Sequence, residues 1–159
     1  MAAVGYHFGS TEALLNAALL TALEDWGDEF RHALDSAATG SAARDEALWG
    51  AILDSFTAHR ALAMASIDAV VQAEHEPGLR AQLAAGQQAG RRGLAALLTD
   101  TPEDELDEPT VRSLGSIQLA LVTGLLVQAL TDPTQLPSTR EVIDGLRVLS
   151  RRTDVPSTE

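Results

Sequence analysis

The chain contains no cysteine and no lysine among its 159 residues, and only 4% of its residues are aromatic. Without cysteine it cannot form disulfides, thiolate zinc sites or a cysteine nucleophile. Scarce aromatic residues and abundant alanine and leucine favour closely packed helices over a β-sandwich. Arginine supplies all the positive charge, and the net charge is −12. Because so acidic a surface is repelled by phosphates, the chain alone is not expected to bind DNA.

Length and composition predict one compact domain. Hydrophobic residues make up 45% and charged residues 21% of the chain, which is typical of a globular protein. The N-terminus lacks the charged and apolar regions of a secretory signal. The most apolar stretch, from Leu114 to Leu130, is interrupted by glycine and polar residues and is too short and too polar for a convincing membrane span. We therefore expect a soluble cytoplasmic protein with no membrane partner.

Hydrophobic side chains recur at three- and four-residue steps along most of the chain, which predicts an all-α fold. Pro77 and Pro109 suit the first turns of helices, and Ser138 can cap another. Between these signals the sequence predicts six helices, over residues 10–36, 42–57, 58–75, 77–98, 109–130 and 138–151.

The first residues carry a specific motif, Tyr6-His7-Phe8-Gly9-Ser10-Thr11-Glu12-Ala13-Leu14-Leu15. Gly9 is the residue type that follows a helix C-terminus, and Ser10 can cap the next helix. The motif resembles the joint in TetR-family transcriptional regulators between the recognition helix of a helix-turn-helix and the helix that enters the ligand-sensing body. The six helices would then correspond to helices four to nine of such a regulator.

The resemblance implies roles for the residues of this joint. Tyr6 and His7 would contact DNA phosphates, and Gly9 and Ser10 would couple the DNA-binding head to the body. Thr11 stands where many members carry lysine, so a phosphate contact there is weaker or absent. Residues 1–9 would be a remnant of the head, the rest of which is missing from the chain; residues 10–153 would form the ligand-binding and dimerisation domain, and residues 154–159 a flexible tail.

The last two helices carry more apolar surface than the edge of a monomer can leave in water. A two-fold partner with the same pair of helices would complete a four-helix bundle, so we expect a homodimer. The alternative is that both helices are simply core. The predicted interface residues are Ala120, Thr123, Gly124, Val127, Val142, Ile143, Leu146 and Leu149.

Polar residues that interrupt apolar stripes are candidates for a ligand pocket, because a buried polar group needs a partner. Gln118 and Gln87 interrupt such stripes, and Asp68 flanks the stripe through Met64. Each could equally be a core polar residue with an ordinary partner, or face solvent. With apolar walls from aromatic and methionine side chains, the candidates are Trp49, Phe56, Met64, Asp68, Gln87 and Gln118. Few charges in the stripes favour a largely apolar effector.

The function that the resemblance implies is a DNA-binding transcriptional regulator that releases operator DNA when its body binds an effector. We expect a repressor, because repression prevails in the family. One alternative is a small helical enzyme or metal-binding bundle, because Glu29 and His32 have the E-x-x-H spacing of di-iron sites. A second E-x-x-H is absent from the sequence, as are the motifs of phosphate-binding loops and serine hydrolases. A second alternative is a headless dimer that only binds other proteins. We expect no enzyme activity, cofactor or metal.

Overall fold

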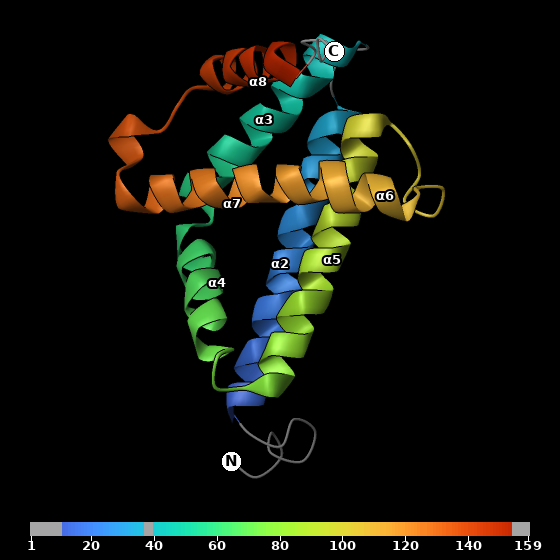
Figure 1. Ribbon diagram of the computed structural model, residues 1–159. Helices are drawn as coiled ribbons and strands as arrows, with labels where there is room; N and C mark the ends of the chain where they lie inside the picture. Colours follow the sequence, from blue (N-terminus) through green and yellow to red (C-terminus); the bar gives the residue numbers. More distant parts are fainter. Residues whose placement is uncertain (1–10, 37–39, 154–159) are drawn as a thin grey trace, which may run out of the picture.

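The computed structural model describes residues 11–36 and 40–153, and this part of the chain contains six long helices and no strand (Figure 1). The all-α prediction is confirmed, and every predicted helix is present with its ends shifted by at most three residues. The helices are α2 (Thr11–Asp35), α3 (Ser41–Ala58), α4 (Arg60–Gln72), α5 (Pro77–Thr99), a continuous helix of α6 (Glu108–Thr110), η1 (Val111–Gly115) and α7 (Ser116–Thr131), and α8 (Thr139–Thr153). A short 3-10 turn, η2 (Pro133–Gln135), precedes α8. Of the predicted joint, Tyr6, His7, Gly9 and Ser10 lie outside the described residues, and Thr11 begins α2.

The long helices α2 and α5 pack side by side, and α4 lies on the other side of the body (Figure 1). Helix α7 runs across the body, crosses α5 before its C-terminal end, and packs on α3, α4 and α5. Helix α8 packs on α3 above α7 in the view of Figure 1, and side chains of these two consecutive helices line one groove.

The main core lies where α2, α3 and α7 meet. Trp26 is at its centre, with ring centroids 6.3 Å from Phe30, 6.4 Å from Phe56 and 5.8 Å from His59. Offset and edge-on aromatic contacts at these distances add to the stabilisation from apolar burial. A smaller cluster at the far end of the body is built on Ala69, Ala73 and Leu79. Apolar packing therefore holds the helices together at both ends of the body, and the middle of α4 lies between the two clusters.

One turn of the α6–η1–α7 helix is π-helical, over Val111–Gly115. Gly115 ends this turn against the backbone of Arg91 on α5, and a Cβ built at Gly115 would lie 2.2 Å from the Arg91 carbonyl oxygen. Only glycine allows so close a crossing of two helices without displacement. Single π-turns interrupt α-helices at places of functional or packing constraint, and this one lies at the crossing of α5 and α7.

Helix α8 begins with a reciprocal cap, as Ser138 predicts. The Ser138 amide donates to Glu141 Oε2 at 2.8 Å, and the Glu141 amide donates to Ser138 Oγ at 3.4 Å. This arrangement satisfies two amides that the start of a helix leaves without partners. The Ser138 hydroxyl, and after it the Ser138 amide, lower the pKa of Glu141 by bonding its charged form.

The lowered pKa of Glu141 gives a pH prediction for the α8 cap. A carboxylate with a depressed folded-state pKa stabilises the fold above its ordinary pKa of 4.5, and this contribution is lost as pH falls through the lower folded value. We expect NMR titration of the Glu141 carboxyl to give a midpoint below 4.5, and Ser138→Ala to move that midpoint back up. A midpoint at or above the ordinary value would show that the cap is not formed in solution.

Candidate functional site

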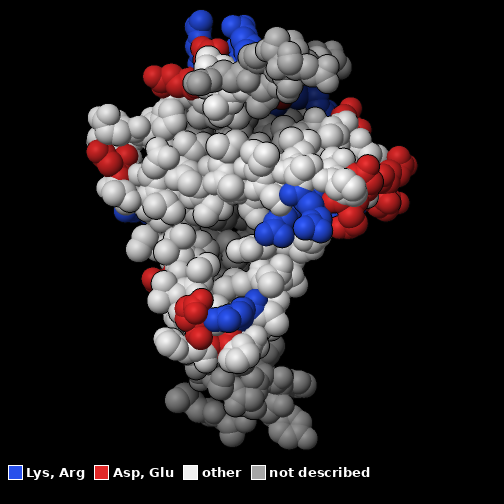
Figure 2. Space-filling view, viewed as in Figure 1, with Lys and Arg blue, Asp and Glu red and all other residues white. Residues whose placement is uncertain are grey.

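A shallow apolar groove runs between α7 and α8 and has a volume of about 290 Å³. Trp49 of α3 lies at its floor and is only 2% exposed. Figure 2 shows a broad band without charged residues along the middle of α7, with acidic and basic residues at the end that carries α6. The side chains that line the groove are Trp49, Ala120, Leu121, Gly124, Leu125, Gln128, Pro137, Glu141, Val142, Gly145, Leu146 and Leu149.

The structure places the eight predicted interface residues together on the face formed by α7 and α8, which we call the α7–α8 face. Ala120, Thr123, Gly124, Val127 and Leu149 are exposed on it. The other three, Val142, Ile143 and Leu146, are half-buried and pack their inner sides on the main core. Large apolar side chains outside the predicted set, Ile117 and Val148, add to the exposed surface at 63% and 57% exposure. Large exposed apolar patches on folded proteins are typical of interaction surfaces.

Two glycines on this face have no packing reason inside the chain. A Cβ built at Gly124 or Gly145 meets no atom within 4 Å. Both residues lie inside helices, where glycine is less favourable than alanine by about 1 kcal/mol. The open space in front of both backbones permits another helix to approach closely.

The predicted pocket residues do not converge on one cavity. Trp49 and Phe56 are buried, and both belong to the main core. Asp68 and Gln87 are exposed, and Met64 is 44% exposed. Helix α4 turns its alanines inward, so the stripe through Met64 faces outward.

Gln118 is buried, at 5% exposure, and its Nε2 has no hydrogen-bond partner among the described residues. The same holds for Trp26 Nε1 and Arg91 Nε. All three are N–H donors, on α7, α2 and α5, the helices that enclose the interior of the body. A buried donor without an acceptor costs about 1–3 kcal/mol, and an ordered water or a bound ligand can supply the acceptor.

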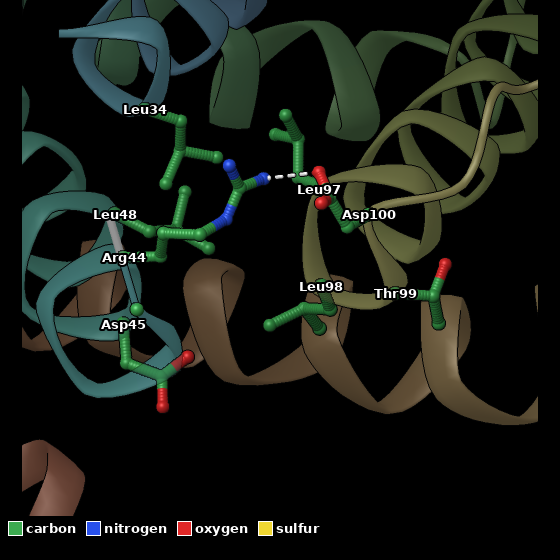
Figure 3. Close-up of a pocket in the computed structure, with 9 residues that line it drawn as sticks. Leu34, Arg44, Asp45, Leu48, Leu97, Leu98, Thr99 and Asp100 are labelled. Atoms are coloured by element: carbon green, nitrogen blue, oxygen red, sulfur yellow. Dashed lines mark hydrogen bonds and ion pairs between the residues drawn. The ribbon is translucent and has the colours of Figure 1, made fainter. Parts of the chain in front are cut away.

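A second cavity, also of about 290 Å³, lies where the ends of α2 and α5 meet the start of α3 (Figure 3). Sequence reasoning gave no signal for it. Its inner wall is made by leucines, among them Leu34 and Leu48. Arg44 reaches across them to Asp100, with Nη2 2.8 Å from Oδ1 (Figure 3). Asp100 ends α5 in the left-handed region, at φ 52°.

The acidic segment after α5 is held by two arginines. Arg92 donates to the carbonyl oxygens of Glu103 at 3.1 Å and Leu106 at 3.4 Å and pairs with Glu108. Arg31 of α2 pairs with Glu103 at 2.9 Å. These contacts tie the segment to α2 as well as to α5.

The Glu29–His32 pair, which would be needed for a metal bundle, is used differently. Glu29 Oε2 lies 2.9 Å from His59 Nε2, across the joint between α3 and α4. Within residues 11–36 and 40–153 no group of three or more histidine, aspartate or glutamate side chains is placed to hold a metal ion. Glu29 and His59 are therefore a contact between helices in this structure.

By length and composition alone, the helix Glu108–Thr131 could cross a membrane. This criterion is weak evidence, because core helices of soluble proteins meet it as well. In the structure one side of this helix packs on α3, α4 and α5, and the other side forms the α7–α8 face.

Comparison with known proteins agrees with this architecture. A family model described as "Tetracyclin repressor-like, C-terminal domain" matches residues 40–149. No curated protein and no solved structure matches the chain. The match covers most of the chain, from the start of α3 into α8, and members of this family are generally regulatory domains without enzyme activity. The chain therefore belongs to the TetR family of tetracyclin repressor-like regulators.

Proposed function

We propose that residues 10–153 are the effector-binding and dimerisation body of a cytoplasmic transcriptional repressor. The main support for the proposal is the α7–α8 face, whose apolar side chains are exposed to water in a single chain. The matched region, residues 40–149, contains most of this face. Operator DNA would be bound by a helix-turn-helix head on the N-terminal side of α2. The net charge of −12 supports the assignment of DNA binding to the head, because the acidic body repels phosphates.

In this proposal two copies join through the α7–α8 face into a four-helix bundle. Val127 and Leu149, at 44% and 59% exposure, would lose their contact with water. At about 25 cal/mol per Å² of apolar surface, covering such side chains on both copies contributes several kcal/mol. The charge-free band along α7 avoids the cost of burying unpaired charges (Figure 2).

The effector would bind in the interior of the body, beside the main core. The three unpartnered donors of Trp26, Arg91 and Gln118 support this location. These donors also indicate which chemical groups the effector would carry. The effector is largely apolar and carries at least one hydrogen-bond acceptor, such as a carbonyl or carboxylate oxygen.

Effector binding would reach the head through α2. This helix packs on α3, α4 and α5, so an effector that separates these helices also shifts α2. Tyr6, His7 and to a smaller extent Thr11 would contact phosphates, and Gly9 and Ser10 would pass the shift from α2 to the head. A change in DNA affinity requires the effector to favour one arrangement by a few kcal/mol.

Replacing Gln118 tests the effector site. If its amide is held for an effector, Gln118→Leu removes an unsatisfied donor at similar volume and raises the free energy of unfolding by about 1 kcal/mol. Urea unfolding of the free protein measures the effect. Gln87→Leu is the matched control, because Gln87 is exposed and its replacement should change stability by less than about 0.5 kcal/mol.

The opposite sign would contradict this site. If Gln118→Leu lowers the free energy of unfolding by about 1 kcal/mol or more, the amide has partners within the protein. Gln118 would then be an ordinary core residue, and the interior would have lost its main polar contact for an effector.

A further inference from the structure

The outward stripe of α7 has a pattern that is nearly the same in both directions. Ile117, Ala120, Gly124 and Val127 follow one another at steps of three, four and three residues, and all four are exposed. Such steps place them on one side of the helix. Read from either end, the order is large, small, small, large.

From this pattern we infer that α7 crosses the α7 of a second copy in antiparallel orientation, with the two-fold axis passing near residue 122. This inference rests on the homodimer proposed above and specifies its register. Ile117 then faces Val127 of the second copy, and Ala120 faces Gly124. A two-fold interface requires this reciprocity, because each contact occurs twice.

The glycines agree with this register. Gly115 and Gly124 lie on the same continuous helix, and the first is in contact with the backbone of Arg91 in its own chain. Gly124 meets nothing within 4 Å in its own chain. In the antiparallel crossing it lies at the point of closest approach, where small residues let two backbones come together. The groove between α7 and α8 gives room for the incoming helix.

The charges near the two ends of the continuous α6–η1–α7 helix are complementary under the same symmetry. Arg112 and Asp132 are both ten residues from the proposed axis, on opposite sides. Arg112 is exposed and makes no ion pair among the described residues. Asp132 is exposed and uses Oδ1 to bind the amide and hydroxyl of Thr134, so Oδ2 is open. A crossing angle of about 20°, common in four-helix bundles, keeps the helix ends close enough for long side chains to meet.

A different bundle would place α7 against α8 of the second copy, and spin labels distinguish the two. The chain has no cysteine, so single cysteines can be labelled in the otherwise unchanged protein. At 1.5 Å rise per residue, labels at Thr131→Cys should lie about 27 Å apart along the helix direction, and labels at Ala120→Cys about 6 Å apart. If α7 faces α8, the two separations should be similar and short.

The distance measurement has three outcomes. A long separation at position 131 with a short one at position 120 supports the register. Similar separations at both positions in a protein of dimeric mass overturn the register and leave the dimer standing. A monomeric mass for the unlabelled wild-type chain overturns both.

Charge reversal tests the ion pairs independently. In Arg112→Asp and in Asp132→Arg, each homodimer places like charges opposite each other twice, and we expect the dimer dissociation constant to rise about tenfold. In an equimolar mixture of the two variants, the heterodimer regains both opposite-charge pairs. Its dissociation constant should therefore equal that of the wild-type dimer. Asp132→Asn removes the charge while its amide oxygen can still accept from Thr134, so it separates the effect of the charge from that of the Thr134 contacts. The Arg112–Asp132 pairing would be overturned if either charge-reversal variant had the dissociation constant of wild type. It would also be overturned if the heterodimer in the mixture dissociated as readily as the two homodimers.

Discussion

Gly115→Ala is expected to lower the free energy of unfolding by about 3 kcal/mol, because the new methyl group has no space. It would lie 2.2 Å from the carbonyl oxygen, 2.9 Å from the carbonyl carbon and 3.2 Å from the Cα of Arg91. All three are backbone atoms inside α5, so a side-chain rotation cannot relieve the overlap. The helices α5 and α7 would have to separate. This separation would also disturb the packing of Val111, which is fully buried in the π-turn.

Urea unfolding compares Gly115→Ala with a matched control, Gly86→Ala. Gly86 lies inside α5, and a Cβ there meets nothing within 4 Å. The same chemical change should therefore stabilise the protein at residue 86, by about 0.5–1 kcal/mol. If both variants shift stability by the same small amount, α5 and α7 do not cross as closely as described.

Val127→Asp is expected to raise the dimer dissociation constant at least about 100-fold, because it puts two carboxylates into an apolar interface. The fold of the single chain should be unaffected, since Val127 is 44% exposed within it. Sedimentation velocity over a range of concentrations measures the dissociation constant, and circular dichroism checks the helix content.

Val71→Asp is the matched control for Val127→Asp. Val71 lies on α4, away from the α7–α8 face, and is 65% exposed. The same substitution there should leave the dissociation constant unchanged. A Val127→Asp protein that remains as dimeric as the control would move the interface to another part of the molecule.

The sequence predicts the helices of this fold well, because local signals decide where they start and stop. Pro77 stands in the first turn of α5, and Ser138 and Glu141 cap α8 as their spacing indicates. The π-turn could not be predicted in this way. Its cause is the contact between Gly115 and Arg91, which brings together residues of two helices and leaves no periodic signal in either.

The candidate site is only partly predictable from hydrophobic patterns, as α4 shows. Met64 belongs to an apolar stripe, and yet the buried side of α4 consists of Ala63 and Ala69. Periodicity gives most weight to large side chains, whereas close packing between helices selects small ones. Gln118 was identifiable because a polar residue within an apolar stripe is unusual, and the structure buries it.

The exposed apolar face was predictable as a group of residues because α7 is apolar around most of its circumference, which one packed face cannot explain. The register between two copies is a different matter. It depends on which outward residues face solvent once α7 lies on α3, α4 and α5, and only the fold supplies that information.

Light scattering of the wild-type chain at micromolar concentration tests most directly whether the α7–α8 face is one half of an interface. We predict a mass of twice the 16.8 kDa of one chain. A mass of 16.8 kDa across that concentration range would contradict the proposed dimer.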